Sequence, residues 1–513
     1  MRIRHVMWIA AIFFPMGVAS AQGASPCNDL KSFQAPRLEI TRAESISAGS
    51  TVPNPYGMPG HSAPLPAYCR VEGVLNRRTG VGGEEFGIHF ALAMPEQWNG
   101  DFLMQGGGGG NGTVLPPIGQ TAAGDTPALM RGFAVVSNDT GHTSHGGPFD
   151  FGFMRDEQAA LDFAYLANNE VAELAKQIIA RYYGKPAAYS YFVGCSTGGR
   201  EGMILSQRYP TTFNGIVSGD PAMRTGLSNL AIGEWIPVAF NQIAPKDAAG
   251  KPIITGAITD ADRNLLIDAL MKKCDAKDGV ADGIISDPLG CDFDPAELAC
   301  KEEKKDGCLP VEKVAAIKKA LGGPVTSRGI QVYPGFPYDA GIAAAGPIRG
   351  LLTPGPGIFG PATTAMEVDV DKEALNDVQP LVDSMSTNLT TFAASGGKLI
   401  FYHGVSDPWF SPLDTLDYYK DMAKGQGGLE AVSRWSQMYL VPGMSHCGGG
   451  PALDRFDLLG PMVEWVEKGQ TPSSVVATGR AMPGVSRPLC AYPKHAQYKG
   501  QGDTKDASNF VCQ

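Results

Sequence analysis

Three residues far apart in the chain have the side-chain types of a serine nucleophile and its activating pair. Ser196 lies in Gly194-Cys195-Ser196-Thr197-Gly198, a Gly-x-Ser-x-Gly pattern typical of a sharp turn that exposes a serine between a strand and a helix. A serine hydroxyl is unreactive near neutral pH and needs a base, which His446 can supply. Asp407 can hold the imidazole in the required tautomer and stabilise its charged form. The three residues therefore predict covalent catalysis by a serine.

Two cysteines flank this candidate machinery. Cys195 directly precedes the serine, and Cys447 directly follows the histidine. A disulfide between them would tie together two loops whose side chains must exchange a proton over roughly 3 Å. The combination predicts a covalent clamp beside the reacting groups.

Other residues of the same types have weaker surroundings. Asp414 and Asp417 follow Asp407 closely, but they fall at the start of an expected helix, where capping or a solvated position explains an acid. His446 has the best loop context of the eight histidines. His403 precedes the Asp407 loop and is a candidate for the lining of the pocket.

An oxyanion hole needs two backbone N–H groups aimed at the developing negative charge. The N–H of Thr197, next to the nucleophile, is one candidate. The run of glycines from 106 to 110 follows an early apolar segment, and its backbone can approach a ligand closely. We select Gly108 from this run. A phosphate-binding loop is excluded because no Gly-Lys-Ser/Thr follows.

Apolar runs of strand length alternate with one strong helical pattern. The helix is expected over residues 158–182, and a second helix over 199–209 follows the serine turn. Parallel strands place active loops at their carboxyl ends, and the order Ser, Asp, His is that of α/β-hydrolases. We predict an α/β-hydrolase core with a mainly parallel sheet, formed by residues 22–222 and 396–513. The expected strands cover residues 84–94, 101–105, 133–138, 189–193, 398–403 and 438–441.

Residues 223–395 differ in character from the rest. They hold four of the ten cysteines, an acidic cluster and a tract rich in glycine and proline over residues 332–361. We predict an inserted lid domain over the active site. The acidic cluster, residues 275–284, offers several carboxylates and carbonyls of the kind that Ca²⁺ binds through 6–8 oxygens. Its spacing is not that of an EF-hand, and a solvated acidic turn is the alternative.

The first 21 residues have the pattern of a cleavable signal peptide: early arginines, an apolar stretch over residues 6–18, and small residues at 19–21. The stretch is shorter than the roughly 20 residues of a membrane-spanning helix. Removal of residues 1–21 takes away two arginines and no acids, so the net charge of −10 becomes −12. We expect a secreted or periplasmic protein with no membrane span, a monomer or weak oligomer that does not bind nucleic acid.

Ten cysteines in an exported chain indicate disulfides. Local spacing favours Cys300–Cys308, Cys274–Cys291 and Cys490–Cys512, while the sequence alone leaves the pairing open.

These features together resemble the tannase/feruloyl esterase family over almost the whole chain after the leader. The most specific element is the Cys-Ser…Asp…His-Cys arrangement of Cys195-Ser196, Asp407 and His446-Cys447. The resemblance implies a structural calcium site, no organic cofactor and five disulfides. The implied calcium ligands are Asp275, Asp278 and Asp282 with the carbonyls of Val280 and Ile284. The implied disulfides are Cys27–Cys69, Cys195–Cys447, Cys274–Cys291, Cys300–Cys308 and Cys490–Cys512.

The resemblance also implies a function: a secreted serine carboxylic-ester hydrolase that cleaves esters of aromatic acids, of feruloyl, caffeoyl/chlorogenic or galloyl type, through an acyl-enzyme. The partner is then a small aromatic ester substrate. Hydrolysis of synthetic monoesters such as mono(2-hydroxyethyl) terephthalate is an alternative, although residues 346–350 lack the tryptophan of some family lids. A non-catalytic, calcium-dependent binding protein on the same fold is a further alternative.

Overall fold

The computed structural model describes residues 26–54, 60–301, 307–355 and 361–513. The signal peptide expected at residues 1–21 lies outside these ranges. Within them, no helix combines the length and the apolar character that crossing a bilayer requires.

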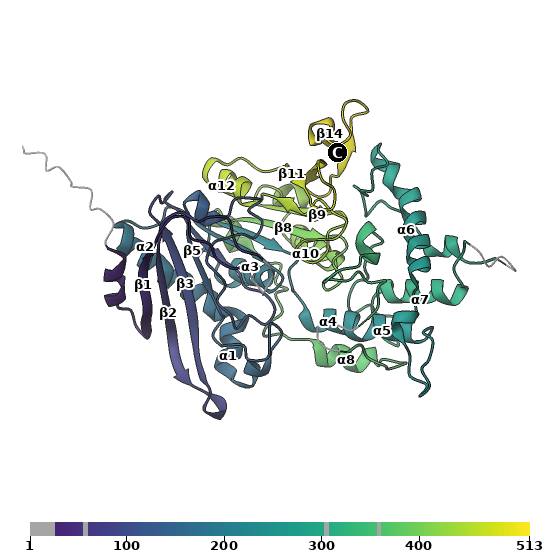
Figure 1. The fold of residues 1–513 in the computed structure, drawn as a ribbon, viewed down its shortest axis with the longest axis horizontal. Coiled ribbons are helices and arrows are strands. Elements are labelled where there is room, and N and C mark those ends of the chain that lie inside the picture. Colours follow the sequence, from purple (N-terminus) through teal and green to yellow (C-terminus); the bar gives the residue numbers. More distant parts are fainter. Residues whose placement is uncertain (1–25, 55–59, 302–306, 356–360) are drawn as a thin grey trace, which may run out of the picture.

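A nine-stranded sheet forms the centre of the fold (Figure 1). Its strand order is β1-β2-β3-β5-β4-β6-β7-β8-β9. The strands from β5 through β4 to β9 run parallel, whereas β1, β2 and β3 are antiparallel to their neighbours. The predicted fold class, an α/β-hydrolase core with a mainly parallel sheet, is confirmed. The strands are β1 (Leu38–Ile46), β2 (Tyr68–Thr79), β3 (Glu85–Pro95), β4 (Phe102–Gln105), β5 (Ala134–Asn138), β6 (Ser190–Cys195), β7 (Gly215–Gly219), β8 (Lys398–Gly404) and β9 (Ser436–Val441).

Six of these strands coincide with the expected ones, namely β3, β4, β5, β6, β8 and β9. β1, β2 and β7 were not anticipated. β7 is only five residues long and has glycine at both ends, which is a weak strand pattern. Two small sheets near the C-terminus were also missed. They contain β10 (Arg455–Phe456), β11 (Ser474–Thr478), β12 (Ser486–Cys490), β13 (Ala496–Tyr498) and β14 (Phe510–Cys512).

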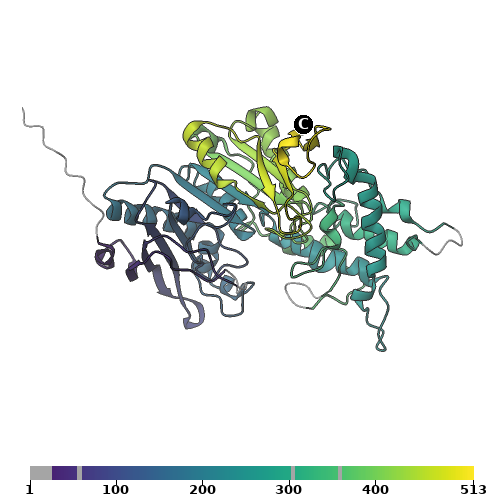
Figure 2. The ribbon, with the colours of Figure 1, turned by 45° about the horizontal axis from the view of Figure 1, so that its top comes forward.

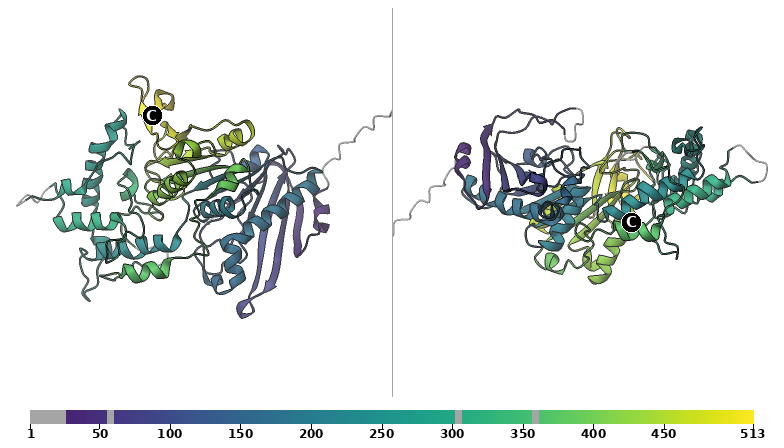
Figure 3. Two further views of the ribbon diagram at one scale, coloured as in Figure 1. Left: turned by 180° about the vertical axis from the view of Figure 1, so that it is seen from behind. Right: turned by 90° about the horizontal axis from the view of Figure 1, so that it is seen from below.

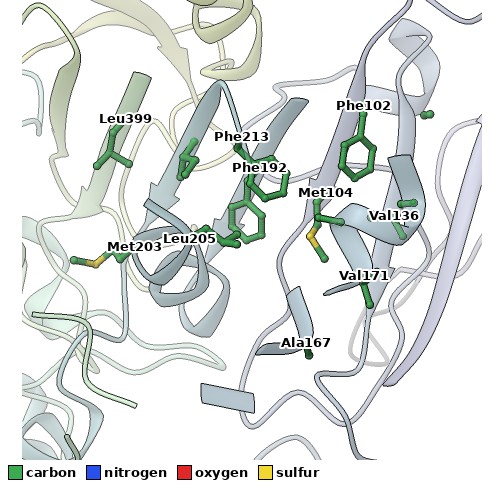
Figure 4. Packing of buried hydrophobic residues seen from close by; sticks show 14 of the residues in the cluster. Phe102, Met104, Val136, Ala167, Val171, Phe192, Met203, Leu205, Phe213 and Leu399 are labelled. Carbon is green, nitrogen blue, oxygen red and sulfur yellow. The ribbon is translucent and has the colours of Figure 1, made fainter. Parts of the chain in front are cut away.

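Helices cover both faces of the central sheet. On one face, α2 (Ala167–Tyr183), α3 (Thr197–Arg208) and α10 (Pro412–Gly425) share a buried cluster with the strands. Figure 4 shows Val171 of α2 beside Met104 and Val136, and Met203 of α3 near Leu399. α12 (Leu459–Lys468) packs on the other face. Burial of each such side chain contributes about 1.5–3 kcal/mol.

The helix expected over residues 158–182 is present but interrupted. α1 (Glu157–Leu161) begins after Asp156, whose carboxylate accepts the N–H of Ala159 at 3.0 Å, and a π-helical turn (Asp162–Leu166) joins it to α2. α2 ends at Tyr183, and the residue that caps it is Gly184, where φ is 73° and glycine avoids the strain of a Cβ.

The segment between β7 and β8 has a hydrophobic cluster of its own, which includes Phe240, Leu266, Ile317 and Leu352. Most of its helices gather on the side of the molecule away from β1 and β2 (Figures 2 and 3), whereas Phe392, near the end of the segment, packs into the cluster of the central sheet. We call residues 223–395 the inserted segment. Its helices are α4 (Thr225–Asn229), α5 (Ile236–Asn241), α6 (Asp260–Cys274), α7 (Val311–Gly322), α8 (Val370–Asp377) and α9 (Thr390–Ala394), and α11 (Leu429–Val432) lies between α10 and β9.

All ten cysteines form disulfides, and the pairs are those that the resemblance implied. They are Cys27–Cys69, Cys195–Cys447, Cys274–Cys291, Cys300–Cys308 and Cys490–Cys512. No cysteine is left free.

Asp101 is a buried acid that directly precedes β4. Burial, assisted by the neighbouring carboxylate of Glu467, raises the pKa of Asp101 to about 7. Because the folded protein holds this proton more tightly than the unfolded chain, stability falls as the pH rises from about 4 to about 7. We expect Asp101→Asn to raise the Tm relative to wild type by roughly 1–3 °C at pH 8 and by less at pH 5. Thermal unfolding at both pH values measures this, with the exposed Asp268→Asn as control, and an equal shift at both pH values would contradict it.

Candidate active site

Ser196 occupies the tight turn between β6 and α3. Its backbone has φ 64° and ψ −124°, an unusual conformation for a residue with a side chain. Both glycines of the motif lie so close to neighbouring backbone atoms that there is no room for a side chain. A Cβ at Gly194 would lie 2.4 Å from the Gly198 carbonyl oxygen, and a Cβ at Gly198 would lie 2.8 Å from the Gly107 carbonyl oxygen. The strand, turn and helix around Ser196 are the context that the motif needs.

His446 and Asp407 meet at the carboxyl ends of β8 and β9. His446 Nδ1 lies 2.7 Å from Asp407 Oδ2. Both side chains are buried, and Asp407 also accepts the N–H groups of Trp409 at 2.8 Å and Phe410 at 3.1 Å. Burial disfavours the ionised carboxyl, but the His446 and His403 imidazoles hold the pKa of Asp407 below its usual range. The geometry is that of a base held by an acid.

The second nitrogen of His446 remains available. Nε2 is buried and has no hydrogen-bond partner among the described residues, so it is not hydrogen-bonded to Ser196 in this structure. The Cys195–Cys447 disulfide joins the neighbour of Ser196 to the neighbour of His446, with 6.0 Å between the two cysteine Cα atoms. Nucleophile–base hydrogen bonds are often long without substrate and tighten when it binds. The arrangement can therefore deliver a proton acceptor to the serine.

Breaking this disulfide tests its importance for the site. For the double variant Cys195→Ser/Cys447→Ser we expect kcat to fall by about 10–100-fold, because small displacements of paired catalytic groups have effects of that size. A stability loss of about 2–5 kcal/mol is also expected. Steady-state kinetics and thermal unfolding measure both. Cys490→Ser/Cys512→Ser removes a disulfide outside the site and is the matched control, and equal kcat in the two double variants would refute the clamp.

The glycine-rich loop after β4 lies against the start of α3. Gly107 donates its N–H to Glu201 Oε2 at 3.1 Å, and Asn111 Nδ2 donates to Glu201 Oε1 at 2.5 Å. The Thr197 hydroxyl donates to the Gly109 carbonyl. The Gly108 N–H has no acceptor among the described residues, unlike that of Gly107. Thr197 is the first residue of α3, where a backbone N–H has no partner within the helix. Both N–H groups selected from the sequence are thus free to donate.

Aromatic rings surround His446. The ring centres of Trp409 and Phe410 lie 4.5 and 5.4 Å from the imidazole, and Phe149 meets Trp409 edge to face at 6.2 Å. These three rings are only partly buried. They offer apolar surface beside the reacting groups.

Behind Asp407 lies a fully buried pair, His403 and Asp220. His403 Nε2 is 3.3 Å from Asp407 Oδ2 and 3.7 Å from Asp220 Oδ1. Burial opposes protonation of His403, but the two carboxylates raise its pKa, while burial raises the pKa of Asp220 to about 7. The expectation that His403 lines the pocket is wrong. Its ring is wholly covered, with Nδ1 2.8 Å from Thr415 Oγ1.

Asp414 and Asp417, the two acids that follow Asp407 closely in the sequence, do not pair with His446. Asp414 is buried on α10 and forms an ion pair with Arg224, so the expectation of a capping or solvated role is wrong for this residue. Ser411 caps α10 instead, accepting the Leu413 N–H. Neither Asp414 nor Asp417 hydrogen-bonds to His446. Of the three acids, Asp407 alone pairs with the imidazole.

The acidic loop follows α6 and is closed by the Cys274–Cys291 disulfide. Its carboxylates accept hydrogen bonds from the loop itself. Asp275 accepts hydrogen bonds from the N–H groups of Asp282 and Gly283, each at 3.1 Å. Asp278 accepts one hydrogen bond from the Val280 N–H and another from the Ser286 hydroxyl. Asp282 pairs with Arg487.

The fit of this loop to a hard cation is mixed. The Val280 and Ile284 carbonyls have no hydrogen-bond donor among the described residues, as cation ligands require. Asp278 is 3 % exposed, and burial raises its pKa. Over the described ranges, however, no three acidic residues of the loop bring their carboxylate oxygens within 4.8 Å of one another. The donor types suit Ca²⁺, and the carboxylates are not gathered around one point.

Comparison with known proteins agrees with this architecture. The family described as tannase and feruloyl esterase matches residues 69–355 and 359–513. The chain is 37% identical over 520 residues to mono(2-hydroxyethyl) terephthalate hydrolase of Piscinibacter sakaiensis, covering 88% of this chain and 85% of that protein. It is 28% identical over 542 residues to a probable feruloyl esterase of Arthroderma benhamiae, covering 99% and 97%.

Solved structures share the fold. Feruloyl esterase B of Aspergillus oryzae superposes with a TM-score of 0.75 at 24% identity, covering 95% of this chain and 99% of that one. Tannin acyl hydrolase of Aspergillus niger gives a TM-score of 0.70 at 21% identity, covering 96% and 93%. The sheet order, the serine turn and these structural neighbours define the fold as that of the α/β-hydrolases. Within that class, the chain belongs to the tannase and feruloyl esterase family and is a carboxylic ester hydrolase.

Proposed function

We propose that the protein is a secreted serine esterase that cleaves esters of aromatic carboxylic acids through an acyl-enzyme. The pairing of His446 Nδ1 with Asp407 Oδ2 at 2.7 Å, with Nε2 unpartnered, carries this proposal. The disulfide joining the neighbours of Ser196 and His446 supports it. Export is inferred from the leader pattern in the sequence.

The proposed reaction has two halves. Ser196 Oγ attacks the ester carbonyl carbon while its proton passes to His446 Nε2, and the Thr197 and Gly108 N–H groups hold the oxyanion. Collapse of the tetrahedral intermediate breaks the bond to the alcohol oxygen, which takes the proton from His446. Water then attacks the acyl-enzyme by the same route and releases the acid. Asp407 orients the imidazole and stabilises its charged form throughout.

An aromatic acyl group is supported by the rings beside His446. Trp409, Phe410 and Phe149 present partly buried faces and edges, against which a planar ring can stack. Feruloyl, caffeoyl and galloyl esters have such a ring.

A terephthalate monoester is the second candidate substrate, favoured by the 37% identity to an enzyme named for that reaction. Such a substrate carries a free carboxylate in addition to its ring. Arg349, the cation of the tract considered above, is exposed. Among the described residues, its side chain forms no hydrogen bond or ion pair with Ser196, Asp407 or His446.

Hydrolysis of four compounds tests the proposal: methyl ferulate, methyl gallate, chlorogenic acid and mono(2-hydroxyethyl) terephthalate. Wild type and Ser196→Ala are compared by chromatography of the products. Serine-dependent release of one or more acids is expected, and the relative rates rank the acyl groups. Failure of the folded protein to cleave any of the four would refute the aromatic-ester proposal. Other esters would then be tested, and the binding-protein alternative would follow only if those were not cleaved either.

We further propose that the acidic loop binds Ca²⁺ through Asp275, Asp278 and Asp282 and the carbonyls of Val280 and Ile284. The ion would stabilise the inserted segment, which we propose acts as a lid. The calcium ion would take no part in ester hydrolysis, because Ser196, His446 and Asp407 are sufficient for the proposed reaction.

Chelation tests this metal proposal. A ligand that binds only the folded state raises the Tm, so EDTA is expected to lower it by several degrees and added Ca²⁺ to restore it. Asp278→Asn is the matched variant, in which EDTA should change little. Thermal unfolding with and without chelator measures the effect, and identical Tm values for wild type would favour a solvated acidic turn.

A further inference from the structure

Asp339, from the inserted segment, is completely buried between the loops that carry Asp407 and His446. Its Oδ2 accepts the Ser406 hydroxyl at 2.7 Å and the Gly443 N–H at 2.7 Å. Ser406 directly precedes Asp407, and Gly443 lies three residues before His446. One carboxylate oxygen therefore joins the two loops that must hold the acid and the base together.

The contact is tight as well as polar. Ser406 Oγ also accepts the Gly341 N–H at 3.0 Å, and the Ser406 N–H donates to the Met444 carbonyl at 3.0 Å. A Cβ at Gly341 would lie 2.7 Å from the Gly443 carbonyl oxygen and from Ser406 Oγ. Glycine at 341 thus lets the inserted segment approach both loops without room for a side chain.

Fold stability alone gives a poor reason for an acid at this position. The second oxygen of Asp339, Oδ1, is buried without a hydrogen-bond partner, and no cation pairs with the carboxylate over the described residues. A buried charge without a partner cation is costly, and an apolar residue of similar volume avoids that cost. What an apolar side chain could not supply is an oxygen that accepts from both loops.

We propose that Asp339 is a positioning residue that sets the distance and angle between Asp407 and His446. The inserted segment then contributes to the geometry of the catalytic pair in addition to covering the site. This inference rests on the proposed serine esterase mechanism. Asp339 itself touches no reacting atom.

Substitution separates positioning from packing. Asp339→Ala removes both hydrogen bonds, and we expect kcat to fall by about 10–100-fold with KM changed by less than about threefold. Asp339→Asn keeps an oxygen that accepts both donors, so it should restore most of the lost kcat. The downfield NMR signal of the proton between His446 Nδ1 and Asp407 should shift or broaden in the alanine variant and return in the asparagine variant.

Asp383→Asn is the matched control. Asp383 also belongs to the inserted segment, accepts one backbone N–H, from Gln379, and has a buried second oxygen without a partner. It contacts neither catalytic loop, and kcat should stay within about twofold of wild type. If Asp339→Ala does not fold, Ser406→Ala decides, with an expected fall in kcat of about fivefold at a native-like Tm.

The results that overturn the inference are definite. Unchanged kcat and an unchanged NMR signal in Asp339→Ala would do so, as would unchanged kcat in Ser406→Ala. Failure of Asp339→Asn to recover activity would also refute it, because the negative charge rather than the two hydrogen bonds would then be required. If Ser196→Ala retains full esterase activity, the proposed mechanism fails. The NMR signal still reports whether Asp339 positions the His446–Asp407 pair.

Discussion

Replacing Ser196 by alanine should lower kcat for any ester substrate of this protein by about 10⁴-fold or more. Without the hydroxyl there is no covalent acyl-enzyme, and only binding and the oxyanion donors remain to accelerate hydrolysis by water. The fold should persist, because Ser196 is held through its backbone: its N–H donates to Gly219 and its carbonyl accepts from Arg200 and Ala222. Initial rates, together with active-site titration by an organophosphonate fluoride, measure the effect.

His446→Ala is the companion variant. Because serine and histidine act as a unit in the proposed mechanism, the double variant should be little worse than either single one. Additive losses, or more than a few per cent of wild-type kcat in Ser196→Ala, would mean that another residue performs the attack.

Asp407→Asn should have the second largest effect, a fall in kcat of about 10⁴-fold. An amide at this position cannot stabilise the imidazolium, and it favours the wrong tautomer of His446. The expected KM change is small, since Asp407 is fully buried and does not reach the substrate.

Asp414→Asn is the natural control, because it removes a second buried acid seven residues along the chain. This change leaves Arg224 without its ion-pair partner and should cost about 3 kcal/mol of stability. Its kcat should stay within a few-fold of wild type. If the two variants exchanged these phenotypes, Asp414 rather than Asp407 would support the base.

The strands and the candidate triad could be predicted because their signals are local. Apolar runs mark β3, β4, β5, β6, β8 and β9, and the glycines around Ser196 mark the turn. His446 and Asp407 each follow such a run, and parallel strands bring their ends together. The long antiparallel β1 and β2 carry many polar residues on partly exposed positions, so their pattern is weak.

The supporting residues could not be predicted, because their meaning lies in distant partners. Glu201 and Asn111 are 90 residues apart, and Asp339 and Gly443 are 104 apart. Asp220 follows a short strand that was itself missed, so nothing placed it behind Asp407. Aspartate is usually exposed in folded proteins, so nothing in the sequence suggests that these acids are buried. Only the folded arrangement shows the hydrogen bonds that offset the cost of burying them.

The Cys195–Cys447 bridge has a topological consequence. Of the five bridges, it alone joins the chain before the inserted segment to the chain after it, enclosing a separation of 252 residues. A single proteolytic cut within residues 223–395 would therefore leave the two halves of the catalytic core covalently linked. In an oxidising environment rich in proteases, a nicked molecule could keep its serine and histidine together, and only a reductant would let the halves separate.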